Sequence, residues 1–143
     1  NKGEFLEHAK VFNNFYGTSK KFVYQKLKNG KNVLFDIDWQ GANQLKNKKL
    51  NYRLLSFFIL PPSKKVLKQR LTNRHKKDNL IVKERMKQFE KDVKRWKDYK
   101  FVVINDNLKK CYKQILKIIK ADLKNKKINY NKKLVEKHIK KLI

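Results

Sequence analysis

The chain has little cysteine, methionine, glycine or acidic charge, and each shortage excludes a class of protein or site. A single cysteine, Cys111, excludes a framework of intramolecular disulfides and is typical of a reducing compartment, so we expect a cytoplasmic protein. No apolar run approaches the length of a membrane span, and no signal-peptide pattern stands at the start. Because Asn1 comes first and the single methionine is Met86, we expect a further segment upstream.

Acidic residues number 12 against 39 lysines and arginines, which gives a formal net charge of +27. Such a charge attracts nucleic acid, nucleotides and anionic surfaces. The positive residues are almost all lysine, however, and they are spread over the whole chain among frequent asparagine and isoleucine. This pattern indicates compositional drift more than a basic patch. We therefore expect no specific nucleic acid and no membrane partner, and keep a basic nucleic-acid-binding domain as an alternative.

The 143 residues suit one globular domain in which apolar strands alternate with amphipathic helices. This alternation predicts an α/β fold with a mostly parallel sheet. The expected strands lie within 31–38, 53–63 and 99–106, and the expected helices within 18–30, 39–48, 64–74, 78–96 and 107–123. Thr18 or Ser19, Ser63 and Asp78 would cap the first, third and fourth of these helices, and Gly30 would end the first. We expect residues 5–20 to form a pocket wall, because the segment makes a poor core strand. Cys111 falls on the apolar face of the last of these helices, which predicts a core position.

Two aspartates end the first expected strand. Asp36 and Asp38 would lie on one face at the carboxyl end of a parallel strand, where ligands bind in open sheets. Such a pair can position a metal-bound water or a phosphate-binding arginine. A helix cap, or pairing with a lysine, explains them equally well. Asn105 ends the third strand in the same way, in a sequence that also suits a turn and an N-cap.

Arginine is rare, so its placement carries information. Arg70 and Arg74 lie four residues apart on one expected helix and share a face, and Arg85 follows an expected turn. Phosphate oxygens match the planar fork of a guanidinium, which makes a phosphate the natural partner of such a group. A solvated helix face is the alternative.

Glu7 is an acid inside an apolar segment. A carboxylate there can accept two hydrogen bonds from guanine, one from the ring N–H and one from the amino group, whereas adenine presents an unprotonated ring nitrogen. Nearby, Tyr16 would donate its hydroxyl to a phosphate, Gly17 would allow close backbone approach, and Thr18 would add a donor. We read His8 as a neighbour of this site.

Six segments agree in order and spacing with one family. They are GEFLEHAKVFNNFYGTSK, VLFDIDWQGA, FFILPPS, RLTNR, ERM and VVINDNL. Together they resemble bacterial guanylate kinase, from about Gly3 to about Leu123. The resemblance implies the P-loop kinase fold, a parallel sheet with flanking helices, and transfer of the γ-phosphoryl group of Mg-ATP to GMP, which gives GDP and ADP.

The resemblance also implies a division of the chain. Residues 1–123 would be the C-terminal portion of a guanylate kinase domain, in which 1–30 belong to the GMP-binding region, about 70–92 form a helical lid and the remainder is core. Residues 124–143 lie beyond the resemblance and would be a lysine-rich amphipathic tail, helical or frayed, with no role expected beyond that of a solvated helix.

Site roles on the GMP side follow residue by residue. Glu7 is similar to the acid that reads guanine, Thr18 to a second guanine contact, and Tyr16 to a ligand of the GMP phosphate. Asp36 resembles the acid near the phosphates and Mg²⁺, which it would reach through water, and Asp38 its companion. No direct protein ligand of the metal is implied.

On the ATP side, Arg70 and Arg74 resemble lid arginines that close on the phosphates. Arg85 resembles the arginine that reaches the transferred group, and Asn105 lies where the family packs its adenine-side loop. Such arginines neutralise charge as it develops in phosphoryl transfer.

The chain departs from the family pattern in several places. In the lid, Asn73 and His75 stand where the family has the two glycines of Gly-Arg-Gly. Near Tyr16, Asn13 replaces a glycine and Phe15 a tyrosine. Asp106-Asn107 stands in place of a double aspartate. The chain also contains only four glycines and no G-x-x-x-x-G-K-[ST] motif, which would cradle the phosphates. We therefore expect no kinase activity from the 143 residues alone. A catalytically inactive, protein-binding relative is the other alternative.

Overall fold

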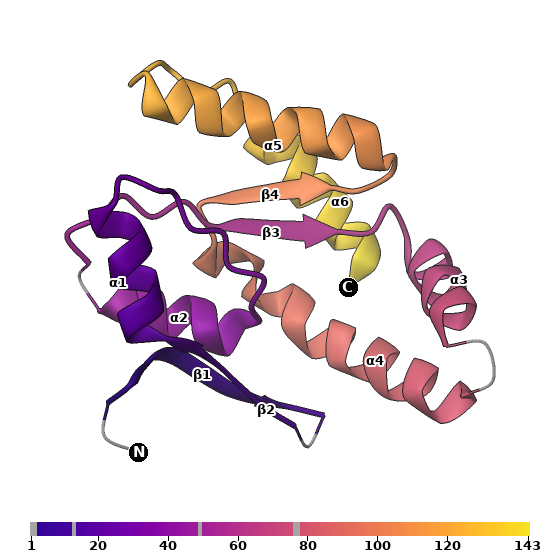
Figure 1. Ribbon diagram of the computed structural model, residues 1–143. Helices are drawn as coiled ribbons and strands as arrows, with labels where there is room; N and C mark the ends of the chain where they lie inside the picture. Colours follow the sequence, from indigo (N-terminus) through magenta and orange to yellow (C-terminus); the bar gives the residue numbers. More distant parts are fainter. Residues whose placement is uncertain (1–2, 13, 49, 76–77) are drawn as a thin grey trace. The chain divides into compact units, whose positions relative to one another are not determined.

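The computed structural model describes residues 3–12, 14–48, 50–75 and 78–143, and the chain divides into two compact units between Leu54 and Leu55 (Figure 1). We call them the N-terminal unit and the C-terminal unit. The sequence departure at Asn13 lies outside the described residues. Across the described ranges, no helix is both long and apolar enough to cross a membrane.

The N-terminal unit is built on a two-stranded antiparallel hairpin and two helices. Strand β1 (Phe5–Val11) pairs with β2 (Asn14–Ser19), and helices α1 (Lys20–Lys28) and α2 (Trp39–Asn47) follow. Leu6, Val23 and Leu45 form the buried core of this unit. The expectation that residues 5–20 would make a poor strand was wrong, because Leu6 turns into this core and gives the hairpin an apolar side.

Helix α1 begins and ends at the signals expected from the sequence. The Ser19 hydroxyl accepts a hydrogen bond from the Phe22 N–H at 3.4 Å, which caps the first turn. Gly30 follows the helix with a φ of +69°, a left-handed conformation that glycine adopts without strain.

The strand expected at residues 31–38 is not formed, which corrects the sequence prediction. These residues carry no strand hydrogen bonding, although Val33, Phe35 and Ile37 pack against the core of the N-terminal unit. Leu34, on the alternate side, is 93% exposed. A strand needs a hydrogen-bonded neighbour as well as an apolar sequence. In the described part of the chain, each of the two sheets consists of two strands that pair with each other, so residues 31–38 have no strand partner there.

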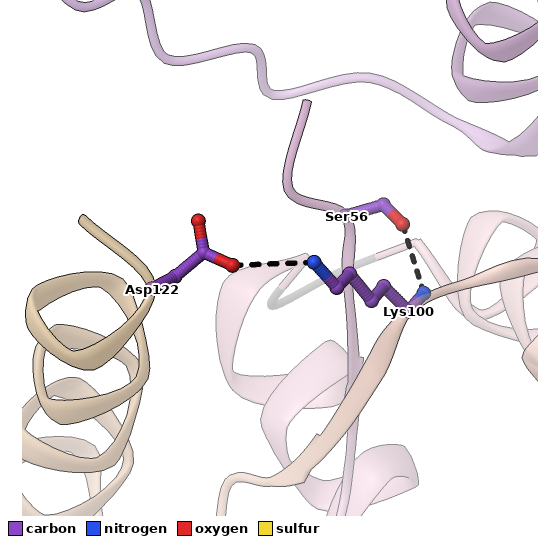
Figure 2. Close-up of polar contacts among 3 residues, drawn as sticks. All are labelled: Ser56, Lys100 and Asp122. Atoms are coloured by element: carbon purple, nitrogen blue, oxygen red, sulfur yellow. Dashed lines mark hydrogen bonds and ion pairs between the residues drawn. The ribbon is translucent and has the colours of Figure 1, made fainter. Parts of the chain in front are cut away.

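The C-terminal unit contains the parallel pairing that the sequence predicts. Strands β3 (Phe57–Leu60) and β4 (Phe101–Ile104) pair in parallel, with Phe57 opposite Phe101. Where they begin, the Lys100 N–H donates to the Ser56 hydroxyl at 2.9 Å and its ammonium lies 3.2 Å from an Asp122 carboxylate oxygen (Figure 2). These contacts help to hold the end of helix α5 (Leu108–Leu123) near the start of the sheet.

Helices make up most of the C-terminal unit. They are α3 (Lys64–Arg74), α4 (Asn79–Asp92), a 3-10 helix η1 (Val93–Asp98), α5 (Leu108–Leu123) and α6 (Lys132–Leu142). Ser63, Asp78 and Asn107 cap α3, α4 and α5 through their side-chain oxygens. Cys111 is buried on α5, as predicted, and burial raises the pKa of its thiol.

The segment after α5 joins the core of this unit. Val135, Ile139 and Leu142 of α6 are buried with residues of both β3 and β4. The Val102 N–H of β4 donates to the Tyr130 hydroxyl at 2.8 Å, and His138 contacts the Pro61 carbonyl oxygen at 2.8 Å. The lysine-rich end of the chain is therefore more than a solvated helix, because its apolar stripe supplies part of the hydrophobic core.

Candidate functional site

Glu7 is the one buried charged residue in the described part of the chain, with 3% of it exposed. The pairing of β1 with β2 places it opposite Thr18. The Thr18 hydroxyl donates a hydrogen bond to one carboxylate oxygen of Glu7. The other oxygen lies against Gly41 in α2, where an added Cβ would stand 2.5 Å from it. The hairpin and the first turn of α2 thus enclose a carboxylate whose two oxygens have different neighbours.

Two glutamines of α2 hold that helix against β1. The side-chain amide of Gln44 accepts from the His8 N–H at 3.1 Å and donates to the His8 carbonyl at 2.6 Å. One turn earlier, Gln40 donates to the Lys10 carbonyl at 3.4 Å. Gln44 thus acts on β1 as a neighbouring strand would, and it fixes the backbone next to Glu7. His8 takes part through its backbone.

Strand β2 presents the other residues expected on the GMP side. Tyr16 is 60% exposed and lies opposite Ala9, so its hydroxyl is accessible. A Cβ at Gly17 would stand 2.8 Å from the Phe5 ring. In this structure, the glycine makes room for that ring.

The two aspartates after the extended segment play different parts. Asp38 caps α2: one carboxylate oxygen accepts from the N–H groups of Gln40 at 2.9 Å and Gly41 at 3.1 Å, and the other accepts from the Gln40 side chain. Asp36 is exposed. Of the two interpretations left open by the sequence, the helix cap applies to Asp38, and Asp36 remains accessible to a ligand.

In the C-terminal unit, the structure brings Arg70 and Asn105 together. The Arg70 guanidinium donates to the carbonyl oxygens of Asn105 at 2.8 Å and Asp106 at 3.1 Å, which ties α3 to the loop after β4. Arg74 is exposed in the last turn of α3, and Arg85 is half-buried on α4. The Asn105 side-chain oxygen is buried without a hydrogen-bond partner.

Gly41 and Gln44 were missed by the sequence analysis. A glycine inside a helical pattern signals close packing, and glutamines four residues apart in WQGANQ share a helix face. Both signals were present, but neither indicates which strand the helix contacts. Over the described ranges, no three His, Cys, Asp or Glu side chains gather as a metal-ligand set.

Comparison with known proteins gives one consistent result. The family model described as Guanylate kinase matches residues 1–122. A guanylate kinase of Buchnera aphidicola subsp. Baizongia pistaciae is 48% identical over 120 residues, which are 84% of this chain and 57% of the relative. A guanylate kinase of Rickettsia prowazekii is 42% identical over 121 residues, 85% of this chain and 60% of the relative.

A solved structure agrees with these relatives. The crystal structure of guanylate kinase from Anaplasma phagocytophilum superposes with a TM-score of 0.68 at 30% identity, over 84% of this chain and 56% of that one. The chain thus spans a little more than half the length of the relatives it matches. The fold is that of part of a P-loop kinase, as the resemblance implies, and the chain belongs to the guanylate kinase family.

Proposed function

We propose that the protein transfers the γ-phosphoryl group of Mg-ATP to GMP and that this chain supplies the guanine-reading acid and the arginine-bearing helices. The observation that carries the proposal is the buried carboxylate of Glu7, held between Thr18 and α2 in a member of the guanylate kinase family. Burying a carboxylate is unfavourable unless hydrogen-bond donors surround it, so the two donors of a guanine base would stabilise it further.

Guanine suits this carboxylate. The base offers a ring N–H and an amino group side by side, which two carboxylate oxygens can accept. The Thr18 hydroxyl already donates to one of these oxygens. A bound guanine would donate to the same oxygen beside this hydroxyl, or would displace the hydroxyl from it. Tyr16, exposed on the neighbouring strand, would donate to the GMP phosphate, next to Gly17.

The ATP phosphates would contact arginines of the C-terminal unit. Arg74 is exposed and would close on the ATP phosphates, and Arg85 would reach the transferred group. Arg70 would first have to leave the carbonyls of Asn105 and Asp106, or act from there by holding the loop that faces the adenine. Mg²⁺ would arrive with ATP, bound chiefly by phosphate oxygens and water, and Asp36 would contact it through water. Cytoplasmic purine nucleotide metabolism is the setting we propose.

Calorimetric titration of the chain with GMP and with AMP tests the GMP side. We expect GMP to bind more tightly, and we expect Glu7→Gln to remove most of the preference, because an amide replaces one acceptor oxygen with a donor. The matched control is Glu4→Gln, an exposed acid three residues earlier. Equal binding of GMP and AMP by the unmodified chain would contradict the proposal.

A second assay concerns turnover. The chain holds no G-x-x-x-x-G-K-[ST] motif, so we expect the 143 residues to form no GDP from ATP and GMP. Measurable GDP formation by the purified chain would show that this motif is dispensable here.

A further inference from the structure

Gly41 lies in the first turn of α2, directly beside the Glu7 carboxylate. A Cβ at this position would stand 2.5 Å from Glu7 Oε2 and 3.2 Å from Glu7 Cδ. A distance of 2.5 Å is closer than real Cβ contacts come. Any side chain at position 41 therefore has to push the carboxylate away from α2.

Strand β1 and the first turn of α2 are both held in place, so an added Cβ at position 41 would displace the Glu7 carboxylate. Gln44 ties the backbone of β1 to α2 through both polar groups of His8. The Gly41 N–H donates to the Asp38 cap at 3.1 Å, which holds the first turn of the helix. A Cβ at Gly41 would also lie 3.2 Å from Ile37 Cβ, so the added atom cannot shift to that side.

Backbone conformation does not explain this glycine. The glycines with positive φ in the described residues are Gly3 and Gly30, and Gly41 is helical. Glycine is a poor helix former, so a residue that served only the helix would be better as alanine. What Gly41 provides is space.

We propose that Gly41 is a positioning residue for purine selectivity: it lets the Glu7 carboxylate lie against α2, in the orientation that accepts a ring N–H and a 2-amino group together. This inference rests on the proposed GMP-binding function. A displaced carboxylate would keep at most one of the two bonds. The site would then lose its preference for guanine over hypoxanthine, which has the ring N–H but lacks the amino group.

The test compares GMP with IMP by calorimetry on the whole chain. We expect the unmodified chain to bind GMP about tenfold more tightly than IMP, as one additional base contact gives. In Gly41→Ala the ratio should fall close to one. Asn43→Ala, exposed on the same helix, also raises helix propensity and should keep the ratio.

The outcomes separate the two proposals. If the unmodified chain binds GMP no more tightly than AMP, the proposed function is wrong, and the selectivity role falls with it. If it prefers GMP to AMP but binds IMP as tightly as GMP, or if Gly41→Ala retains the full preference for GMP over IMP, the role of Gly41 is wrong while the proposed function stands.

A double-mutant cycle of Gly41→Ala and Glu7→Ala, measured by thermal unfolding, tests the contact between the two residues without a ligand. In a Glu7→Ala background the clash with the carboxylate is gone and the 3.2 Å approach to Ile37 Cβ remains, so Gly41→Ala should raise the thermal midpoint of unfolding, although by less than Asn43→Ala does. With Glu7 present, the same change should raise the midpoint less, or lower it. Equal shifts in both backgrounds would overturn the proposal, and the cycle remains informative if Gly41→Ala lowers stability.

Discussion

Different interactions stabilise the interior of each of the two units of the chain. The C-terminal unit has a core of apolar residues drawn from strands and helices, and its largest cluster contains Leu60, Val93, Val102, Val135, Ile139 and Leu142. The N-terminal unit has three buried apolar residues in its cluster and encloses a carboxylate. Around that carboxylate, side chains bond to backbone groups of β1 and of the first turn of α2.

This difference fits the guanine-reading site that we propose for the N-terminal unit. Apolar burial is non-directional and stabilises in proportion to area, which suits a scaffold. Hydrogen bonds are directional and contribute less, but they fix where a charged group points. We therefore expect apolar truncations to cost most in the C-terminal unit and polar truncations to be most informative in the N-terminal unit.

The largest effect should come from Leu60→Ala in β3. Leu60 is 1% exposed, and removal of its side chain from a packed core should lower the free energy of unfolding by about 2–5 kcal/mol. The neighbouring Ile59 is 52% exposed, so Ile59→Ala is the matched control and should cost much less. Urea unfolding measures the free energy of unfolding of both variants, and equal losses would contradict the role of apolar burial in the C-terminal unit.

Next comes the partner of the buried carboxylate. Thr18→Val removes the hydroxyl that donates to Glu7 and leaves that oxygen without this donor, at a cost of about 1–3 kcal/mol. Thr18→Ser keeps the hydroxyl and should retain most of the stability. A loss in Thr18→Ser as large as that in Thr18→Val would assign the effect to packing of the methyl group.

The helix cap of α2 should have a smaller effect. Asp38→Ala removes the acceptor of two backbone N–H groups and should cost about 1 kcal/mol. Asp36→Ala, two residues earlier and exposed, should leave the free energy of unfolding unchanged. A comparable loss in Asp36→Ala would mean that the two aspartates share a structural role.

An effect of similar size concerns Tyr130, where the C-terminal unit uses a polar contact. Tyr130→Phe removes the acceptor of the Val102 N–H and should cost about 0.5–1.5 kcal/mol at neutral pH. Burial raises the pKa of Tyr130 above its ordinary value of 10.0; the hydrogen bond from Val102 opposes this rise, and Glu136 adds to it.

The raised pKa predicts a pH dependence. The unfolded chain ionises this tyrosine near pH 10.0, while the folded chain keeps the proton to higher pH. The stability that Tyr130 contributes is therefore complete below pH 10.0 and falls as the pH rises through the folded pKa. The difference between the unmodified chain and Tyr130→Phe should narrow above pH 10.0 in urea unfolding, and a constant difference would contradict this account.

Local signals in the sequence predicted much of the fold. Ser19, Ser63 and Asp78 cap helices where the pattern expects them, because a cap needs only a side-chain oxygen two or three residues before a free N–H. Strands β3 and β4 follow from short apolar runs. The segment 31–38 has the same kind of run and formed no strand, because pairing depends on a neighbour that local sequence does not specify.

The candidate site shows the same limit at the level of single residues. The sequence alone singled out Glu7 as an acid in an apolar segment, and its six matching segments identified the family. Only the tertiary structure decided that Gly41 touches its carboxylate, that Gln44 bonds to His8, and that Arg70 bonds to the loop after β4. Those contacts join residues more than 30 positions apart, and the folding of the chain creates them. The sequence determined which chemical groups are present and where helices begin; packing determined which of those groups meet.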